Sequence, residues 1–170
     1  MAEQITRESF LDEWENTKKG VVQHMDGQQS VCASMNIDKK GLGMIYQNAY
    51  RAFEAEDYTQ AENLFFILFL LDSKDHNFQT GLGAAYEAQE KFDNAIAMYS
   101  LAMMRNGRSP QLLFRTGKCL LATNRRDEAR IIFELAAESD ITDQNHPQEN
   151  SVDRLVSIEQ SKKMLGLLNG

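Results

Sequence analysis

Three stretches of the chain repeat one pattern of hydrophobic and polar positions. In each stretch, two apolar segments with helical spacing flank a short polar break. Corresponding positions follow one another at intervals of 34 residues: Ala49, Gly83 and Gly117; Tyr58, Phe92 and Arg126; Ala61, Ala95 and Ala129; Phe65, Tyr99 and Phe133. The small residues at fixed places let two helix axes approach closely, so each stretch is expected to form a helical hairpin.

A period of 34 residues with this spacing resembles the tetratricopeptide repeat, in which hairpins stack on one another. Helices are expected near 41–55, 58–71, 76–89, 92–105, 110–123 and 126–139. Pro110 suits the first turn of its helix, with Ser109 as the N-cap. The rings at Phe65, Tyr99 and Phe133 are expected to fill the space between neighbouring hairpins. No strand is required, so the sequence predicts an all-α fold, a short superhelix of three repeats.

Helical segments are also expected on both sides of the repeats. Residues 148–168 form an amphipathic candidate that would cap the third repeat through an apolar side made of Val152, Leu155, Val156, Ile158, Met164, Leu165 and Leu168. A loop is expected at 140–147. Ser9 to Met25 can form a helix with Phe10 and Trp14 on one stripe. The expected organisation is an N-terminal segment 1–40, repeats over 41–140 and a C-terminal loop and helix over 141–170.

The run from Leu64 to Leu71 is apolar around the whole helix, which is more than a one-sided hairpin helix requires. Two explanations stay open at this point. The N-terminal helix of the same chain could cover the additional face, or the face could serve self-association or a partner protein.

Charge and composition narrow the class of protein. The chain has 170 residues, with 25 acidic against 18 basic ones and a formal charge of −7, which disfavours binding to nucleic acid. Cys32 and Cys119 lie outside any CxxC motif and are expected to be reduced thiols. Charged residues interrupt the first thirty positions, and the longest apolar run has eight residues, where a membrane helix needs about 20. A cytoplasmic protein is therefore expected.

The sequence carries no arrangement typical of catalysis. His24, His76 and His146 fall in different segments without metal-ligand spacing, and no phosphate-binding glycine motif is present. Glu54, Glu56 and Asp57 cluster at a hairpin turn, where a solvated turn is the favoured interpretation. We therefore expect no enzyme, no metal and no cofactor.

The first helices of stacked hairpins line a concave groove. The residues expected to face it are Tyr46, Tyr50, Phe53, Asn77, Thr80, Ala84, Glu87, Phe114, Lys118 and Leu121. Aromatic side chains on rigid helices are strong anchors for an extended peptide. A clamp for a terminal carboxylate would need several basic or amide side chains at defined inner positions. The equivalent positions hold Gly43, Tyr46, Tyr50, Gly81 and Gln111, with only Arg115 of the right type. The sequence therefore favours an apolar peptide as ligand, although the three rings of the first hairpin could instead pack against the N-terminal segment.

A more specific resemblance rests on several motifs: Tyr46 to Tyr58, Ala61 to Asp72, Gly81-Leu82-Gly83-Ala84, Ala95-Ile96 with Tyr99, and Pro110 followed by Lys118-Cys119-Leu120-Leu121. Over residues 40 to 140 the chain resembles the class II chaperones of bacterial type III secretion systems. The resemblance implies a cytosolic protein that binds hydrophobic translocator subunits through an extended segment in the groove, with Tyr46, Tyr50 and Phe53 forming pockets. Several members of this family form homodimers through N-terminal helices, so the resemblance is also consistent with a homodimer in which residues 6–35 and the run at 64–71 take part. A tetratricopeptide adaptor or regulator of an assembly complex remains the alternative.

Overall fold

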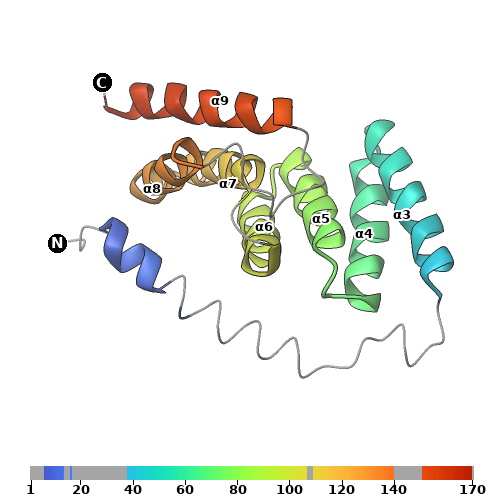
Figure 1. Ribbon diagram of the computed structural model, residues 1–170. Helices are drawn as coiled ribbons and strands as arrows, with labels where there is room; N and C mark the ends of the chain where they lie inside the picture. The colour runs from blue at the N-terminus through green and yellow to red at the C-terminus, as the bar shows by residue number, and fades with distance from the viewer. Residues whose placement is uncertain (1–5, 14–15, 17–37, 107–108, 140–150, 170) are drawn as a thin grey trace. The chain divides into compact units, whose positions relative to one another are not determined.

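The computed structural model describes residues 6–13, 16, 38–106, 109–139 and 151–169 (Figure 1). In these ranges every regular element is a helix, which confirms the predicted all-α class. After a helical segment at 7–13 come α3 (Lys39–Glu54), α4 (Tyr58–Leu71), α5 (His76–Ala88), α6 (Phe92–Asn106), α7 (Pro110–Ala122), α8 (Arg126–Ala137) and α9 (Ser151–Asn169). The expected loop 140–147 and most of the expected helix from Ser9 to Met25 lie outside the described residues.

The chain forms two compact units that divide between the second and third hairpins. One unit comprises Val22–Arg105, with α3, α4, α5 and nearly all of α6. The other comprises Met1–Val21 together with Asn106–Gly170, and it holds α7, α8 and α9.

Short polar side chains decide where the helices begin. The carboxylate of Asp38 accepts a hydrogen bond from the backbone N–H of Gly41 at 2.8 Å, and Asp57 accepts one from Gln60 at 3.0 Å. The Ser109 hydroxyl oxygen accepts from the Leu112 N–H at 3.2 Å, directly before Pro110. Each cap satisfies a donor that the helix itself leaves unpaired. The six helices of the hairpins begin within two residues of the positions expected from the sequence, and α9 begins three residues later than expected.

The turns inside the three hairpins share one backbone geometry. Glu56, Glu90 and Asn124 have φ angles of 60°, 59° and 61°, in the left-handed region. The N–H of the residue after each of them donates to a carbonyl five positions back, as from Lys91 to Tyr86 at 2.9 Å. This is the Schellman pattern, which ends a helix and turns the chain at once. The 34-residue period thus extends to single backbone angles.

Glycine in the first helix makes room for an aromatic ring of the second. A Cβ atom built on Gly83 would lie 2.6 Å from the ring of Tyr99, and one on Gly117 would lie 2.5 Å from the ring of Phe133. Both rings are fully buried. The expectation that these rings fill the space between neighbouring hairpins is therefore incomplete: Tyr99 and Phe133 each lie against the glycine of their own hairpin.

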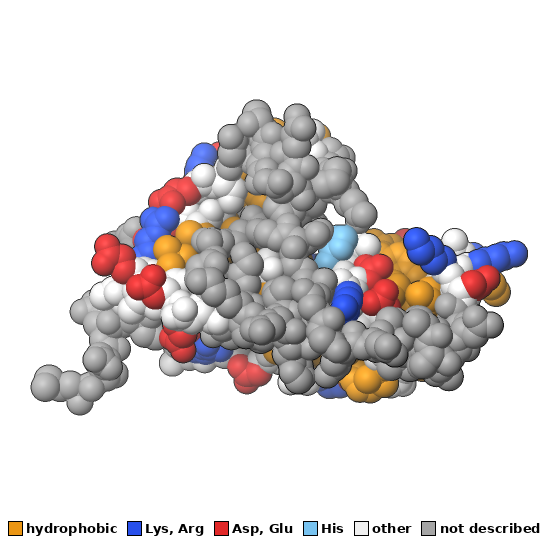
Figure 2. All heavy atoms as spheres, turned by 60° about the horizontal axis from the view of Figure 1, so that its bottom comes forward, with side chains coloured by type: hydrophobic (Ala, Val, Ile, Leu, Met, Phe, Trp, Pro, Cys, Tyr) orange, Lys and Arg blue, Asp and Glu red, His pale blue; other side chains and the backbone are white. Residues whose placement is uncertain are grey.

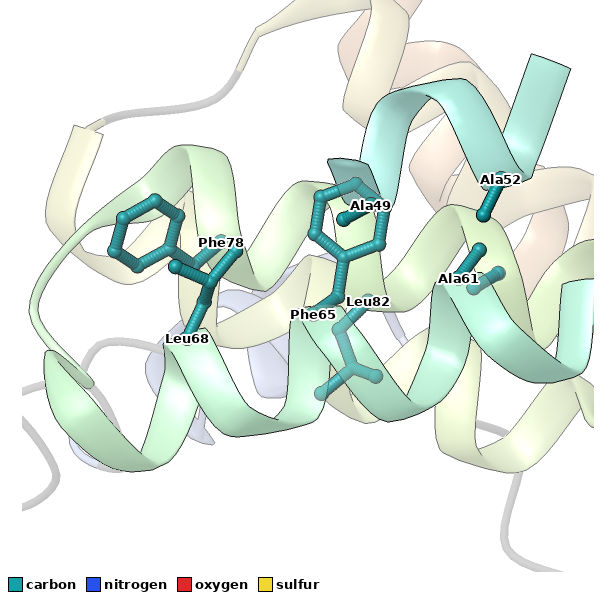
Figure 3. Close-up of a cluster of buried hydrophobic side chains, with 8 residues drawn as sticks. Ala49, Ala52, Ala61, Phe65, Leu68, Phe78 and Leu82 are labelled. Atoms are coloured by element: carbon teal, nitrogen blue, oxygen red, sulfur yellow. The ribbon is translucent and has the colours of Figure 1, made fainter. Parts of the chain in front are cut away.

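The first hairpin uses a different partner for its ring. It carries Ala49 where the other hairpins have glycine, and the Phe65 ring extends toward Ala49 and packs against the backbone of Gly81 in the next hairpin (Figure 3). Ala52 and Ala61 face each other across α3 and α4, while Leu68 lies beside Phe78 of α5. Phe65 therefore lies between hairpins, as the sequence predicted, and joins α4 to α5.

The apolar run on α4 has one buried and one exposed face. Phe65, Leu68 and Leu71 belong to the core, whereas Phe66, Ile67 and Leu70 are between 43% and 54% exposed. Figure 2 shows hydrophobic side chains at the surface on the side of the molecule where α3 and α4 lie, bordered by charged ones. The described part of the N-terminal helix, 7–13, is instead attached to α8 in its own unit. There the Arg7 guanidinium donates to both carboxylate oxygens of Glu138, one at 2.8 Å, and these hydrogen bonds lower the pKa of Glu138.

Helix α9 packs through only part of the face that the sequence predicts. Ile158 is buried as expected, but Val152, Leu155 and Val156 are exposed. The buried face is completed by Arg154, Ser157 and Ser161. Small serines allow a close approach to α7 and α8, and each serine hydroxyl is satisfied inside the helix, as from Ser161 to the Ser157 carbonyl at 2.8 Å. Met164, Leu165 and Leu168 are half-buried. The prediction of a cap on the third hairpin is therefore right in place, but only part of the predicted apolar side is buried.

Candidate peptide-binding surface

Helix α3 presents a tyrosine pair in which one ring supports the other. Tyr50 is 51% exposed, and its ring centroid lies 6.1 Å from that of Tyr46. The half-buried Tyr46 ring also lies 5.9 Å from Phe65 and 5.8 Å from Phe78. Tyr46 is thus fixed among three rings, and Tyr50 extends this aromatic cluster to the surface.

The hydroxyl of Tyr46 stays protonated in this environment. Burial of the side chain, reinforced by Tyr50 and by the negative charge of Asp75, raises the pKa of the Tyr46 phenol above its ordinary value of 10. A neutral phenol both donates and accepts hydrogen bonds. Tyr46 therefore offers an apolar ring and a polar tip at the same place.

Phe53, the third aromatic residue expected on this face, is half-buried one turn further along α3. Its ring packs against Tyr58 at the start of α4, with 5.4 Å between centroids. The first-hairpin aromatics are therefore neither sealed in the interior nor isolated on the surface. They form a supported layer with partly accessible edges, the arrangement that an aromatic anchor site needs.

The expected residues of α5 lie in the same unit and are mostly polar. Asn77 and Thr80 are half-buried, while Ala84 belongs to the core and leaves little of its methyl group to a ligand. The Glu87 carboxylate accepts a hydrogen bond of 2.6 Å from the hydroxyl of Tyr99. Unit Val22–Arg105 therefore combines aromatic side chains on α3 with polar side chains on α5.

The remaining three expected residues lie on α7, in the other unit. Phe114 is half-buried against Phe133, with 6.0 Å between ring centroids. The Lys118 ammonium lies 5.7 Å from the centre of the Phe114 ring, a cation–π contact, and Lys118 is exposed. Leu121 is half-buried. This helix thus offers an apolar surface with one positive charge.

Phe78 is a residue of this site that the sequence analysis did not single out. Its ring is buried beside Tyr46 and shapes the surface from below. The signal was available, because Phe78 is the apolar residue in the first turn of α5, after the N-cap Asp75. Only the packed structure shows that its ring reaches α3.

Two classes of site were searched for across the described ranges. No group of three or more His, Cys, Asp or Glu side chains lies close enough to hold a metal ion there. None of the helices described is both long and apolar enough to cross a bilayer.

Comparison with known proteins identifies relatives of the chain. No protein-family model matches it. It is 29% identical over 114 residues to the Low calcium response locus protein H of Yersinia pestis, an alignment that covers 67% of this chain and 68% of the relative.

Solved structures give a closer view of the relatives. The type III secretion translocator chaperone SycD of Yersinia enterocolitica is 26% identical, with a TM-score of 0.67 over 83% of this chain and 99% of SycD. An alternative dimer of SycD matches with 26% identity and a TM-score of 0.66, over 78% and 95% of the two chains. SycD in complex with a peptide of the translocator YopD matches with 27% identity and a TM-score of 0.61, over 75% and 97%. The resemblance found in the sequence is thereby confirmed: in sequence and in fold, this chain is a relative of the type III secretion translocator chaperones.

Proposed function

We propose that this protein is a bacterial cytoplasmic chaperone that binds a hydrophobic translocator of a type III secretion system and shields it before export. The observation that carries the proposal is the aromatic cluster of α3, in which the exposed Tyr50 rests on Tyr46 and Tyr46 is fixed between Phe65 and Phe78. The relative SycD has been solved with a peptide of the translocator YopD, which supports the same ligand class for this chain.

The physical task of such a chaperone follows from the chemistry of its client. A protein that later inserts in a membrane exposes apolar segments, and these aggregate if they stay bare in water. Binding one segment on a preformed aromatic surface lowers the concentration of the aggregating form. The proposed function needs no covalent chemistry and no cofactor, since a competing component at the secretion apparatus can release the client.

Separate roles are proposed for the residues of the site. Tyr50 is the accessible anchor, whereas Tyr46 and Phe53 form the floor on which an apolar side chain of the client rests. Asn77 and Thr80 on α5 supply polar groups for the backbone of an extended segment. In the other unit, Phe114, Lys118 and Leu121 are proposed as a further contact region, in which Lys118 favours acidic client residues. Ala84 and Glu87 border the contacts that Asn77 and Thr80 make on α5.

The exposure of each side chain selects the variant that tests this function. Tyr46→Glu would place a charge among three rings and unfold the hairpin, whereas Tyr50→Glu alters a half-exposed ring. We expect Tyr50→Glu to reduce recovery of a coexpressed translocator about tenfold, with an unchanged helical spectrum. Gln60→Glu, an exposed change of the same charge on α4, is the matched control and should retain the client. Full recovery with Tyr50→Glu would contradict the proposed site.

A further inference from the structure

Helix α9, the last helix of the chain, exposes apolar side chains although another face of it is already buried. Its inner face is buried through Ile158 and Ser161, while Leu155, Val156 and Leu167 are 41%, 47% and 66% exposed. A terminal helix in a repeat protein normally has a polar outer face, because nothing stacks on it. Exposed apolar side chains gathered on one such helix are typical of an interaction surface.

Apolar and oppositely charged side chains form a line along the outer face of α9. Val156, Glu159, Lys163 and Leu167 follow one another at spacings of three and four residues, so they lie along one side of the helix. Beside this line, Leu155 lies near its beginning and Gly166 near its end. A Cβ atom on Gly166 would meet no other atom within 4 Å, so the space above it is open.

We propose that this outer face binds the same face of a second copy of the chain, with the two α9 helices antiparallel and the two-fold axis near the level of Ser161. In this register Val156 of one copy lies against Leu167 of the other. Glu159 lies against Lys163, and Leu155 lies over Gly166, where the missing side chain permits close approach. Two-fold symmetry makes each contact occur twice.

Charge decides between the antiparallel arrangement and the alternatives. A parallel pair would set Glu159 against Glu159 and Lys163 against Lys163, whereas the antiparallel pair sets opposite charges together. Glu159 already forms an ion pair with Lys162 of its own helix at 2.8 Å and is still largely exposed, so it can also receive Lys163 of the second copy. The face is therefore complementary to itself in one orientation.

The exposed face of α4 is a weaker candidate for self-association. Phe66, Ile67 and Leu70 are exposed there, but α4 has no lysine or arginine to set against its own Glu62. Nothing on α4 therefore fixes the orientation of a second copy. A single helix of 19 residues is about 28 Å long, so we expect the α9 pair to give a weak dimer that depends on protein concentration.

Disulfide trapping tests the register directly. In a Cys32→Ser background of the full chain, Val156→Cys and Leu167→Cys are prepared as two separate proteins and then mixed under mild oxidation. The two positions are 11 residues apart, about 16 Å along one helix, and a disulfide needs Cα atoms within about 7 Å. We expect a covalent dimer in the mixture and none with either variant alone.

A charge reversal provides the control. Lys163→Glu should abolish the trapped dimer because it opposes Glu159, and adding Glu159→Lys should restore it. The proposal would be overturned if either cysteine variant alone formed a covalent dimer, or if Phe66→Cys on α4 formed one instead. It would also be overturned if the protein had a monomer mass at all protein concentrations. Recovery of the translocator is expected to be unchanged in these variants, because the surface on α3 is a different site, so the outcome for α9 is separable from the proposed function.

Discussion

The hydroxyl of the buried Tyr99 donates a 2.6 Å hydrogen bond to the carboxylate of Glu87. The other hairpins have phenylalanine in place of Tyr99, and they have Phe53 and Leu121 in place of Glu87. The middle hairpin thus contains a polar pair where its neighbours contain an apolar one. A buried phenol needs a hydrogen-bond partner, so the two substitutions are coupled.

This coupling predicts a non-additive pair of mutations. Glu87→Leu should cost about 1–3 kcal/mol of unfolding free energy, because it removes a carboxylate acceptor from a buried hydroxyl. Tyr99→Phe should cost about 1 kcal/mol. The double variant, which reproduces the chemistry of the third hairpin, should be more stable than Glu87→Leu alone. Urea unfolding of the wild type, the two single variants and the double variant measures the coupling. Strictly additive losses of unfolding free energy would show that the two residues act independently.

The close approach of Gly83 to Tyr99 predicts that alanine is harmful there. A helix interior ordinarily gains about 1 kcal/mol when alanine replaces glycine. At Gly83 the new methyl group would overlap the buried Tyr99 ring, so we expect a net loss of about 1–3 kcal/mol. Gly43→Ala on α3 is the control, because a Cβ atom there meets nothing within 4 Å. Thermal unfolding should show a lower midpoint for Gly83→Ala and a higher one for Gly43→Ala.

The positive φ angles in the hairpin turns predict that glycine is stabilising at these positions. Glu90 has a φ of 59°, a region that costs an L-residue with a side chain about 1 kcal/mol relative to glycine. We expect Glu90→Gly, and equally Glu56→Gly, to raise the free energy of unfolding. Asn124→Gly should have a smaller effect, since asparagine tolerates this region. Equal effects at Glu90 and Asn124 in denaturant titrations would argue against backbone strain as the cause.

The hydrogen bonds of Glu62 with Gln89 and Lys91 link the first two hairpins, and they predict that the free energy of unfolding depends on pH. The Glu62 carboxylate on α4 accepts hydrogen bonds from Lys91 at 2.6 Å and Gln89 at 2.7 Å. Burial raises the pKa of Glu62, but the hydrogen bonds and the charge of Lys91 outweigh it, so the pKa lies below its ordinary value of 4.5. The stabilisation is therefore complete above about pH 4.5 and is lost as the pH falls through the lower pKa of the folded state.

Glu62→Gln tests this dependence because glutamine keeps the shape and removes the charge. At pH 7 the variant should be less stable than the wild type by about 1 kcal/mol. The difference should shrink when both proteins are unfolded by urea at progressively lower pH, beginning below about 4.5. A difference that stays constant across this range would mean that the ionised carboxylate contributes nothing specific.

Signals in the sequence were sufficient for most of the helices and for proposing part of the candidate site. The cap Ser109 and the helix-starting Pro110 act over a few residues, and the period of 34 residues is visible in the sequence alone, so all three can be read without a structure. Tyr46 and Tyr50 were identified for the same reason: their positions follow from the register of the repeat. Phe78 was missed, because its role depends on a ring contact between α5 and α3.

The sequence by itself determined that this protein is a set of stacked helical hairpins with an aromatic first helix, because helix periodicity, caps and turn geometry depend on neighbouring residues. Only the tertiary structure decided which face of α9 is buried, because apolar side chains lie on more than one side of this helix and their spacing alone does not select one side. There Ile158 is buried together with the small side chains of Ser157 and Ser161. The same holds for the pairing of Tyr99 with Glu87 and of Arg7 with Glu138, since contacts between distant residues depend on how the helices pack.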